Sequence, residues 1–308
     1  MLSLLFAFLF ASTHLGRGSH EKPQSTGYID IHGTRLNYVV EGKGTPCLVI
    51  GSSIYYPRTF SKNLRKHFRL YFVDMRWFAK TYVPTPLKTF TIESLVAEID
   101  QVRTKLKLDR MVLMGHSIHG SIAFEYSKRY PKNVSHLVMV GSPIILGSQA
   151  YEDEAARMWK TASVKRQKLQ SYNWSHMPDF KKHPHLQPDV ENYIAMTPKY
   201  WHNPEYAARW LWNGMTINQG IFHHLYQNLF ANYAMFGKRS SAPVSTLAIL
   251  GKYDYVIPYT TWLKYKRMPN LALRVLPKSG HTPQLEEPRR FDAVLLDWMG
   301  KSTRRRIR

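Results

Sequence analysis

The chain has 308 residues, of which 44% are hydrophobic and 21% are charged, so it is long enough to bury one large core. Its formal net charge of +22 favours contact with anionic surfaces, but the basic residues are spread along the chain apart from the run at 304–308, so we expect no specific nucleic-acid partner. The single cysteine, Cys47, excludes an intramolecular disulfide and lies in an apolar run typical of a core residue.

An apolar run occupies residues 2–10, near the amino terminus. It is too short to span a bilayer but long enough for the core of a signal peptide, although no basic side chain precedes it. We favour a cleaved export leader, with a periplasmic or secreted protein that begins near His14, over an amino-terminal extension of a cytoplasmic protein. The polar residues 13–25 then form a linker.

The following elements alternate between strand and helix. Residues 28–31 and 36–40 predict an antiparallel hairpin at a sheet edge. Further apolar runs predict strands at 47–50, 70–74, 111–114, 137–140, 247–250 and 272–276. One apolar face over 92–106 predicts a helix with Thr91 as its N-cap, and a closing helix begins at Pro288. This alternation predicts an α/β fold with a mostly parallel central sheet covered by helices on both faces.

Residues 147–239 interrupt that alternation. The segment contains five of the eight tryptophans, and its patterns predict helices, for example over 155–169 and 221–233. Aromatic residues this dense can form a core of their own, but an insertion between consecutive strands also lies over the strand ends and lines an apolar pocket. We divide the chain into a leader and linker (1–25), a core (26–146 and 240–300), a helical cap (147–239) and a basic tail (301–308).

A sharp turn stands between the strand at 111–114 and the helix that we expect from Ser121 to Pro131. The turn reads Gly115-His116-Ser117, which places a serine at the apex of a strand–turn–helix unit, the nucleophile elbow. The turn lifts the serine hydroxyl clear of the sheet, and the amides that follow face the site where negative charge develops.

A serine nucleophile needs a base, and the base needs an orienting carboxylate. Asp254 follows the strand at 247–250, and His281 follows the strand at 272–276. Residues 141–143, after the strand at 137–140, contain no carboxylate, which removes the main rival position for the acid. The sequence therefore predicts Ser117, Asp254 and His281 as nucleophile, acid and base.

From about Tyr28 to Gly300 the sequence resembles the α/β-hydrolase superfamily, in the branch that includes proline iminopeptidases and related esterases. The residues that carry the resemblance are the Gly115-His116-Ser117 turn, Gly251 to Asp254 with Pro258, Gly280 to Pro288, and the fold-stabilising Asp74-Met75-Arg76. The resemblance implies an α/β-hydrolase fold with a helical cap, and it implies the order nucleophile, acid, base found here.

Three positions depart from the family pattern. Where the family commonly has His-Gly after its third strand, this chain has Gly51-Ser52-Ser53. The resemblance implies an oxyanion hole made by the backbone N–H of Ile118 and that of Ser53, with Ser52 and Ile54 as alternatives for the second donor. His119 stands where glycine is usual, either as a packed, hydrogen-bonded residue or as a residue of the pocket. The His-Gly-Gly-Pro-Gly motif of proline iminopeptidases and their tryptophan after the serine are absent.

We interpret the chain as a serine hydrolase that cleaves a carboxylic ester of a small apolar substrate, with an amide as the second choice and with no cofactor. The runner-up enzyme is an aminopeptidase, which needs a cap carboxylate to hold the substrate ammonium. The candidates are Glu152, Asp153, Glu154, Asp189, Glu191 and Glu205. A third alternative is a non-catalytic binding protein.

Two further chemistries are disfavoured by the residues present. Aspartate-nucleophile relatives are disfavoured because serine occupies the elbow. Metal binding is also disfavoured, because the histidines at 183, 185, 223 and 224 lack a carboxylate or cysteine at ligand spacing.

Overall fold

The computed structural model describes residues 25–83, 86–231, 233–238 and 241–307, with the side chains of 301–307 left out. Of the expected leader and linker (1–25), residues 1–24 lie outside the described residues. Within the described ranges, no helix is long and apolar enough to cross a membrane.

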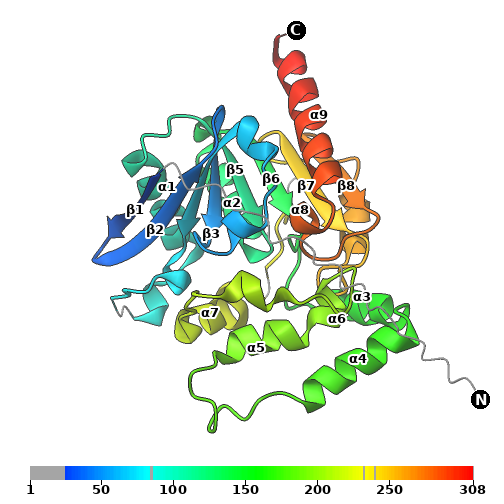
Figure 1. Cartoon of the computed structure of the whole chain (residues 1–308). Helices are drawn as coiled ribbons and strands as arrows, with labels where there is room; N and C mark the ends of the chain where they lie inside the picture. Colours follow the sequence, from blue (N-terminus) through cyan, green and yellow to red (C-terminus); the bar gives the residue numbers. More distant parts are fainter. Residues whose placement is uncertain (1–24, 84–85, 232, 239–240, 308) are drawn as a thin grey trace, which may run out of the picture.

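An eight-stranded sheet forms the centre of the molecule, in the order β1-β2-β4-β3-β5-β6-β7-β8 (Figure 1). The strands are β1 (Ser25–Ile31), β2 (Thr34–Glu41), β3 (Thr45–Gly51), β4 (Phe68–Asp74), β5 (Met111–His116), β6 (Val134–Val140), β7 (Thr246–Gly251) and β8 (Leu271–Leu276). β1 pairs with β2, and β2 with β4, in antiparallel register, while β4, β3 and β5 to β8 pair in parallel. The predicted edge hairpin and mostly parallel sheet are therefore confirmed.

Helices cover the sheet because each presents an apolar face to it. α1 (Ile92–Lys105) begins at Thr91, whose side chain accepts from the amide of Ser94 while the Ser94 hydroxyl accepts from the amide of Thr91. α2 (Ile118–Arg129) packs on β5 and β6, and α9 (Pro288–Ile307) packs on β7 and β8. The short α8 (Pro283–Glu286) precedes α9, and 3₁₀ turns occupy Tyr56–Arg58, Leu64–Lys66, Arg76–Phe78, Leu87–Thr89, Pro131–Asn133, Ala208–Trp212 and Tyr259–Tyr265.

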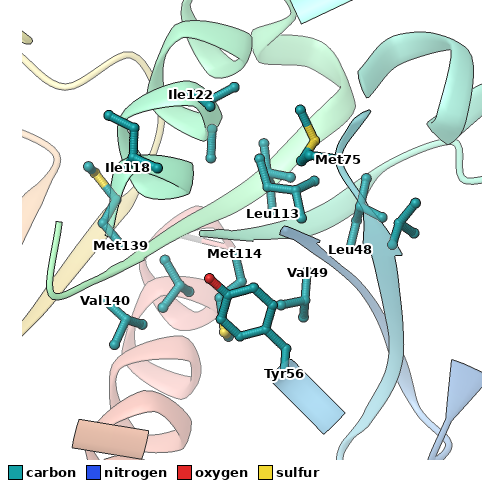
Figure 2. Packing of buried hydrophobic residues seen from close by; sticks show 14 of the residues in the cluster. Leu48, Val49, Tyr56, Met75, Leu113, Met114, Ile118, Ile122, Met139 and Val140 are labelled. Carbon is teal, nitrogen blue, oxygen red and sulfur yellow. The ribbon is translucent and has the colours of Figure 1, made fainter. Parts of the chain in front are cut away.

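The centre of the core lies between α2 and the middle strands. Figure 2 shows Ile118 and Ile122 of α2 in one apolar cluster with Leu113 and Met139. Cys47 is fully buried in β3 and is a free thiol, as its apolar surroundings in the sequence predict.

Between β6 and β7 the chain forms α3 (Gln149–Lys160), α4 (Val164–Ser175), α5 (Pro188–Ala195), α6 (Thr197–Tyr200) and α7 (Gln219–His224), which runs into a π-helical turn at Leu225–Leu229. Figure 1 shows these helices gathered at one end of the sheet, below the strands. The division of the chain into core and cap remains a prediction.

The expected single helix over 155–169 is wrong. The first helix ends at Lys160, and a second begins at Val164 because the side chain of Ser163 caps it by accepting from the amide of Arg166. The expected helix over 221–233 begins two residues earlier, at Gln219, where Asn218 provides the cap, and its helical turns end at Leu229.

Candidate active site

Ser117 stands between the last residue of β5 and the first residue of α2, with φ 55° and ψ −133°. A non-glycine residue in this left-handed region is strained, and such strain persists only where the surroundings impose it. The amide of Ser117 donates to the carbonyl of Val140 on the neighbouring strand at 2.8 Å. Gly120 lets the helix approach, since a Cβ there would lie 1.9 Å from the Ser142 hydroxyl. Close packing against Ser142 therefore requires a glycine at position 120, one residue after the position where the family usually has it.

Asp254 and His281 lie on the loops after β7 and β8 and meet at the same edge of the sheet. Nδ1 of His281 lies 2.6 Å from Oδ2 of Asp254, whose side chain is completely buried. The other carboxylate oxygen accepts from the amides of Val256 and Ile257 at 3.0 and 2.8 Å. Because a carboxylate only accepts hydrogen bonds, Nδ1 carries the proton and Nε2 is left as the basic nitrogen. Ser117 and His281 line one cavity.

Glu286 holds the loop that carries His281. Its Oε1 accepts from the amides of Gly280 and Thr282, on either side of His281, at 2.9 and 3.2 Å, and its Oε2 accepts from the amide of His202 at 2.7 Å. Burial raises the pKa of Glu286 to about 7. Glu286 belongs to the Gly280–Pro288 segment, but the sequence does not indicate its role, because its contacts form only when the loop folds back.

The amide of Ser53, which is the predicted second oxyanion donor, is bonded outside the cavity. The amide of Ser53 donates to Oδ1 of Asp74 at 2.6 Å, so it is directed at β4. The cause is the strand register, which places Asp74 opposite Gly51 and leaves its buried carboxylate in need of donors; burial raises its pKa to about 6. Ser52 lines the cavity instead, and its Oγ accepts from the amides of Ile54 and Tyr55 at 3.1 Å each.

Ile118, whose backbone N–H is predicted to be one oxyanion donor, directly follows Ser117. It is the first residue of α2, where a backbone N–H has no partner inside the helix, and it lines the cavity.

His119 is hydrogen-bonded and also lines the cavity. It is therefore both a packed residue and a residue of the pocket, which the sequence analysis gave as alternatives. Its Nδ1 lies 3.0 Å from the His116 carbonyl and 3.0 Å from the Tyr56 hydroxyl. Gly51 provides the space, because a Cβ there would lie 2.2 Å from the Tyr56 ring and 3.2 Å from Cε1 of His119. The glycine at 51 and the histidine at 119, both departures from the family pattern, therefore accommodate each other.

The cavity has a volume of about 70 Å³ and is walled mainly by aromatic side chains. They come from both sides of the site and comprise Tyr55, Tyr56, Phe78, Tyr193, Tyr200, Trp201, Trp212, Phe222 and Tyr226. None of the residues that line it, all within the described part of the chain, is Asp, Glu, Lys or Arg. The site is therefore aromatic and formally uncharged apart from its histidines.

Five of the six cap carboxylates proposed for an ammonium have other partners. Glu191 makes two bonds to Arg209, at 2.5 and 2.7 Å, and Glu154 makes two to Arg157. Elsewhere Asp153 accepts from Gln149, Asp189 lies 3.1 Å from His223, and Glu205 lies 3.0 Å from Lys165. Glu152 does not line the cavity either.

Among the residues with described side chains, no three His, Cys, Asp or Glu residues are grouped so as to hold a metal ion. The rings of His183 and His185 lie 6.0 Å apart, and His224 contacts the Phe90 carbonyl.

The fold and the elbow define the class of protein. The sequence model of the alpha/beta hydrolase fold family matches residues 47–288, and this chain belongs to that family. An AB hydrolase superfamily protein of Bacillus subtilis, YclE, is 30% identical over 279 residues, which are 90% of this chain and 99% of that protein.

Two more distant likenesses point to the same fold. A proline iminopeptidase of Heyndrickxia coagulans is 23% identical over 293 residues, covering 89% of this chain and 98% of that protein. The structure of an alpha/beta fold family hydrolase from Bacillus anthracis superposes with a TM-score of 0.67 at 17% identity, covering 89% of this chain and 99% of that one.

Proposed function

We propose that this protein is a serine hydrolase that cleaves carboxylic esters of small, uncharged, largely apolar substrates. The observation that carries the proposal is the cavity that contains both Ser117 and His281 and is walled by aromatic rings without a charged Asp, Glu, Lys or Arg side chain. An ester needs no ionic partner, and burial of its apolar groups against such walls contributes roughly 25 cal/mol per Å².

In this mechanism Nε2 of His281 removes the proton of Ser117 Oγ as that oxygen attacks the ester carbonyl. The resulting imidazolium is stabilised by Asp254 and gives its proton to the leaving alcohol, which releases an acyl-enzyme. His281 then takes a proton from water, whose oxygen attacks the acyl carbon, and returns it to Ser117 as the acid leaves. The 2.6 Å contact of Nδ1 with Asp254 supports this assignment of protons.

For the oxyanion we propose the amide of Ile118 and the hydroxyl of Ser52 as donors. The Ser52 oxygen already accepts two amide protons, at 3.1 Å each, so its own proton remains to be donated. We do not propose Ser53 for this role, because its amide donates to Asp74.

The likeness to a proline iminopeptidase makes an aminopeptidase the second candidate. Its substrate carries an ammonium group, which is costly to bury without a negative partner. The wall of the cavity offers no carboxylate, and most of the cap carboxylates are bound to other side chains. We therefore propose that a free amine on the substrate brings no gain.

The test compares one acyl group with and without an α-amine on the same p-nitrophenol leaving group, beside amino-acid arylamides. We expect comparable kcat/KM for the two esters and little cleavage of the arylamides. A preference of about a hundredfold or more for the amine would replace the esterase with an aminopeptidase.

Ser117→Ala provides the control, because it deletes one oxygen at the turn. We expect ester turnover to fall by about 10³-fold or more with an unchanged thermal unfolding midpoint. Turnover within tenfold of wild type would remove Ser117 from the mechanism. Absence of turnover in the wild type on every ester, with retained ligand binding, would favour a non-catalytic binding protein.

A further inference from the structure

Two hydrogen bonds hold the backbone of His281. Its amide donates to the carbonyl of Tyr200 in α6 at 2.5 Å, and its own carbonyl oxygen lies 2.8 Å from Nε2 of His116, the last residue of β5. A carbonyl oxygen only accepts hydrogen bonds, so Nε2 of His116 carries a proton and donates it. His116 directly precedes Ser117, and the strand that leads to the proposed nucleophile therefore also binds the loop of the proposed base.

The ring of His116 is neutral and has one proton. Burial lowers its pKa well below the usual 6.5, and the neighbouring His281 lowers it further. With the proton on Nε2, Nδ1 is an acceptor, and the hydroxyl of Tyr56 donates to it at 3.4 Å. The Tyr56 oxygen in turn accepts from Nδ1 of His119 at 3.0 Å. These contacts fix the ring, because a flipped ring would place Cε1 against the His281 carbonyl.

Gly141, in the loop after β6, leaves the space for this contact. Its φ is 52°, and a Cβ there would lie 2.7 Å from the carbonyl oxygen of His281 and 3.6 Å from Nε2 of His116. A side chain at position 141 would therefore displace the acceptor of the hydrogen bond. The rings of His116 and His281 also contact each other, with centroids 4.6 Å apart and planes at 58°. The bond is thus part of a close-packed contact between the elbow and the His281 loop.

The bond from His116 complements the one to Asp254. Two rotatable bonds join the imidazole of His281 to its backbone, so the ring is fixed only if both the backbone and one ring atom are held. Asp254 holds Nδ1 of the ring at 2.6 Å, and His116 holds the peptide group that carries the side chain. A misplacement of about 1 Å between reacting groups can cost about 10²-fold in rate. The distance of Nε2 of His281 from Ser117 therefore depends on both bonds.

We propose that His116 is a positioning residue, which sets the place of the His281 imidazole relative to Ser117 by donating a hydrogen bond to the His281 carbonyl. The inference rests on the proposed function, in which Ser117 is the nucleophile and His281 the base, and it adds a residue outside that triad. His116 also lines the cavity, so the tests must distinguish positioning of the base from contact with the substrate.

The first test needs neither a variant nor activity. Long-range ¹H–¹⁵N NMR of the wild-type protein with ¹⁵N-labelled histidine should show His116 neutral at pH 7, with Nε2 protonated and Nδ1 bare. A bare Nε2 would overturn the proposal, because that nitrogen would have no proton to donate to the His281 carbonyl.

The second test compares two variants of similar side-chain length on a p-nitrophenyl ester. H116Q retains an N–H donor near the position of Nε2, while H116M has none. We expect kcat of H116M to fall by about 10²-fold with KM within a few-fold of wild type, and H116Q to recover about tenfold of that loss. An equal loss in both variants would contradict the proposal, and a raised KM with unchanged kcat would make His116 a substrate contact instead.

Thermal unfolding midpoints of both variants accompany these rates. A residue that only stabilises the fold would lower the midpoint and leave kcat per folded molecule unchanged, and that result would also contradict the proposal.

The third test uses a fluorophosphonate, which separates this inference from the proposed ester substrates. Oγ of Ser117 forms a bond to phosphorus, fluoride leaves, and His281 takes the serine proton, so labelling depends on this pair and not on the natural substrate. We expect H116M to be labelled about 10²-fold more slowly than wild type, with H116Q between them. Slow labelling of H116M would support the role of His116 even if no ester is turned over. Equal labelling rates in wild type and H116M would refute that role and leave the esterase proposal intact.

Discussion

Asp254 is the residue whose replacement has the most specific expected result. In Asp254→Asn the amide oxygen still accepts from Val256 and Ile257, while the NH₂ group faces Nδ1 of His281 and requires that nitrogen to be bare. The proton then lies on Nε2, which no longer acts as a base. We expect kcat for a p-nitrophenyl ester to fall on the order of 10⁴-fold with little loss of stability. If the variant remains active and another aspartate proves essential, the acid has been misassigned.

Ser52 and Ser53 form a matched pair of neighbouring serines. Replacing Ser52 with alanine deletes the hydroxyl proposed for the oxyanion, and we expect kcat to fall by about 10²-fold with a smaller change in KM. Ser53→Ala retains the amide that donates to Asp74, so its kcat should stay within a few-fold of wild type. Steady-state kinetics and unfolding curves of both proteins make the comparison. A kcat within a few-fold of wild type in Ser52→Ala would remove the Ser52 hydroxyl from this role.

At the scale of elements, the loop between β8 and α8 should make stability depend on pH through Glu286. Burial raises its pKa from 4.5 to about 7, so between these values the folded protein keeps a proton that the unfolded chain has released. The stability contributed by the protonated form is present below pH 4.5 and is lost as the pH rises through 7.

Glu286→Gln removes this titration. We expect the free energy of unfolding of the wild type, taken relative to Glu286→Gln, to fall by about 1–3 kcal/mol between pH 4.5 and 7. Urea unfolding at fixed pH values measures the difference. Parallel curves for the two proteins across this range would show that Glu286 is ionised throughout.

The link between the cap helices and the sheet is also an element-scale feature. The guanidinium of Arg58 donates to the carbonyls of Trp210, Leu211 and Asn213 at 2.8 to 3.0 Å. The amide of His281 donates to the carbonyl of Tyr200 at 2.5 Å. The loop that carries the proposed base is therefore held by the cap as well as by Glu286.

At the scale of the whole molecule, the size of the cavity between cap and sheet should set the acyl chain preference. We expect kcat/KM for p-nitrophenyl esters to rise as the acyl chain grows from acetate. Each added methylene is buried against aromatic carbon and should lower the activation free energy by at most about 0.8 kcal/mol. The aromatic walls bound the cavity, so the rise should stop at a medium chain length, once the cavity is full. A rate that is flat from acetate to hexanoate, or highest for acetate, would show that the acyl chain lies outside this cavity.

The sequence by itself determined that the central sheet is mostly parallel with an edge hairpin, and which segments carry the candidate site. The strands read as apolar runs because β3 and β5 to β7 are buried, and Thr91 could be recognised as a cap because capping depends on residues three apart. Ser117, Asp254 and His281 each follow a parallel strand, and the carboxyl ends of parallel strands lie at one edge. Their common location therefore follows from chain order.

Only the tertiary structure decided the contacts between segments far apart in the sequence. The amide of Ser53 turns to Asp74 because strand register places that buried carboxylate beside it. His119 fits because Gly51, 68 positions earlier, leaves room for its ring. Glu191 is bound by Arg209, 18 positions later, and none of the cap carboxylates proposed for an ammonium lines the cavity. These outcomes depend on packing in three dimensions, which periodicity and motif spacing do not encode.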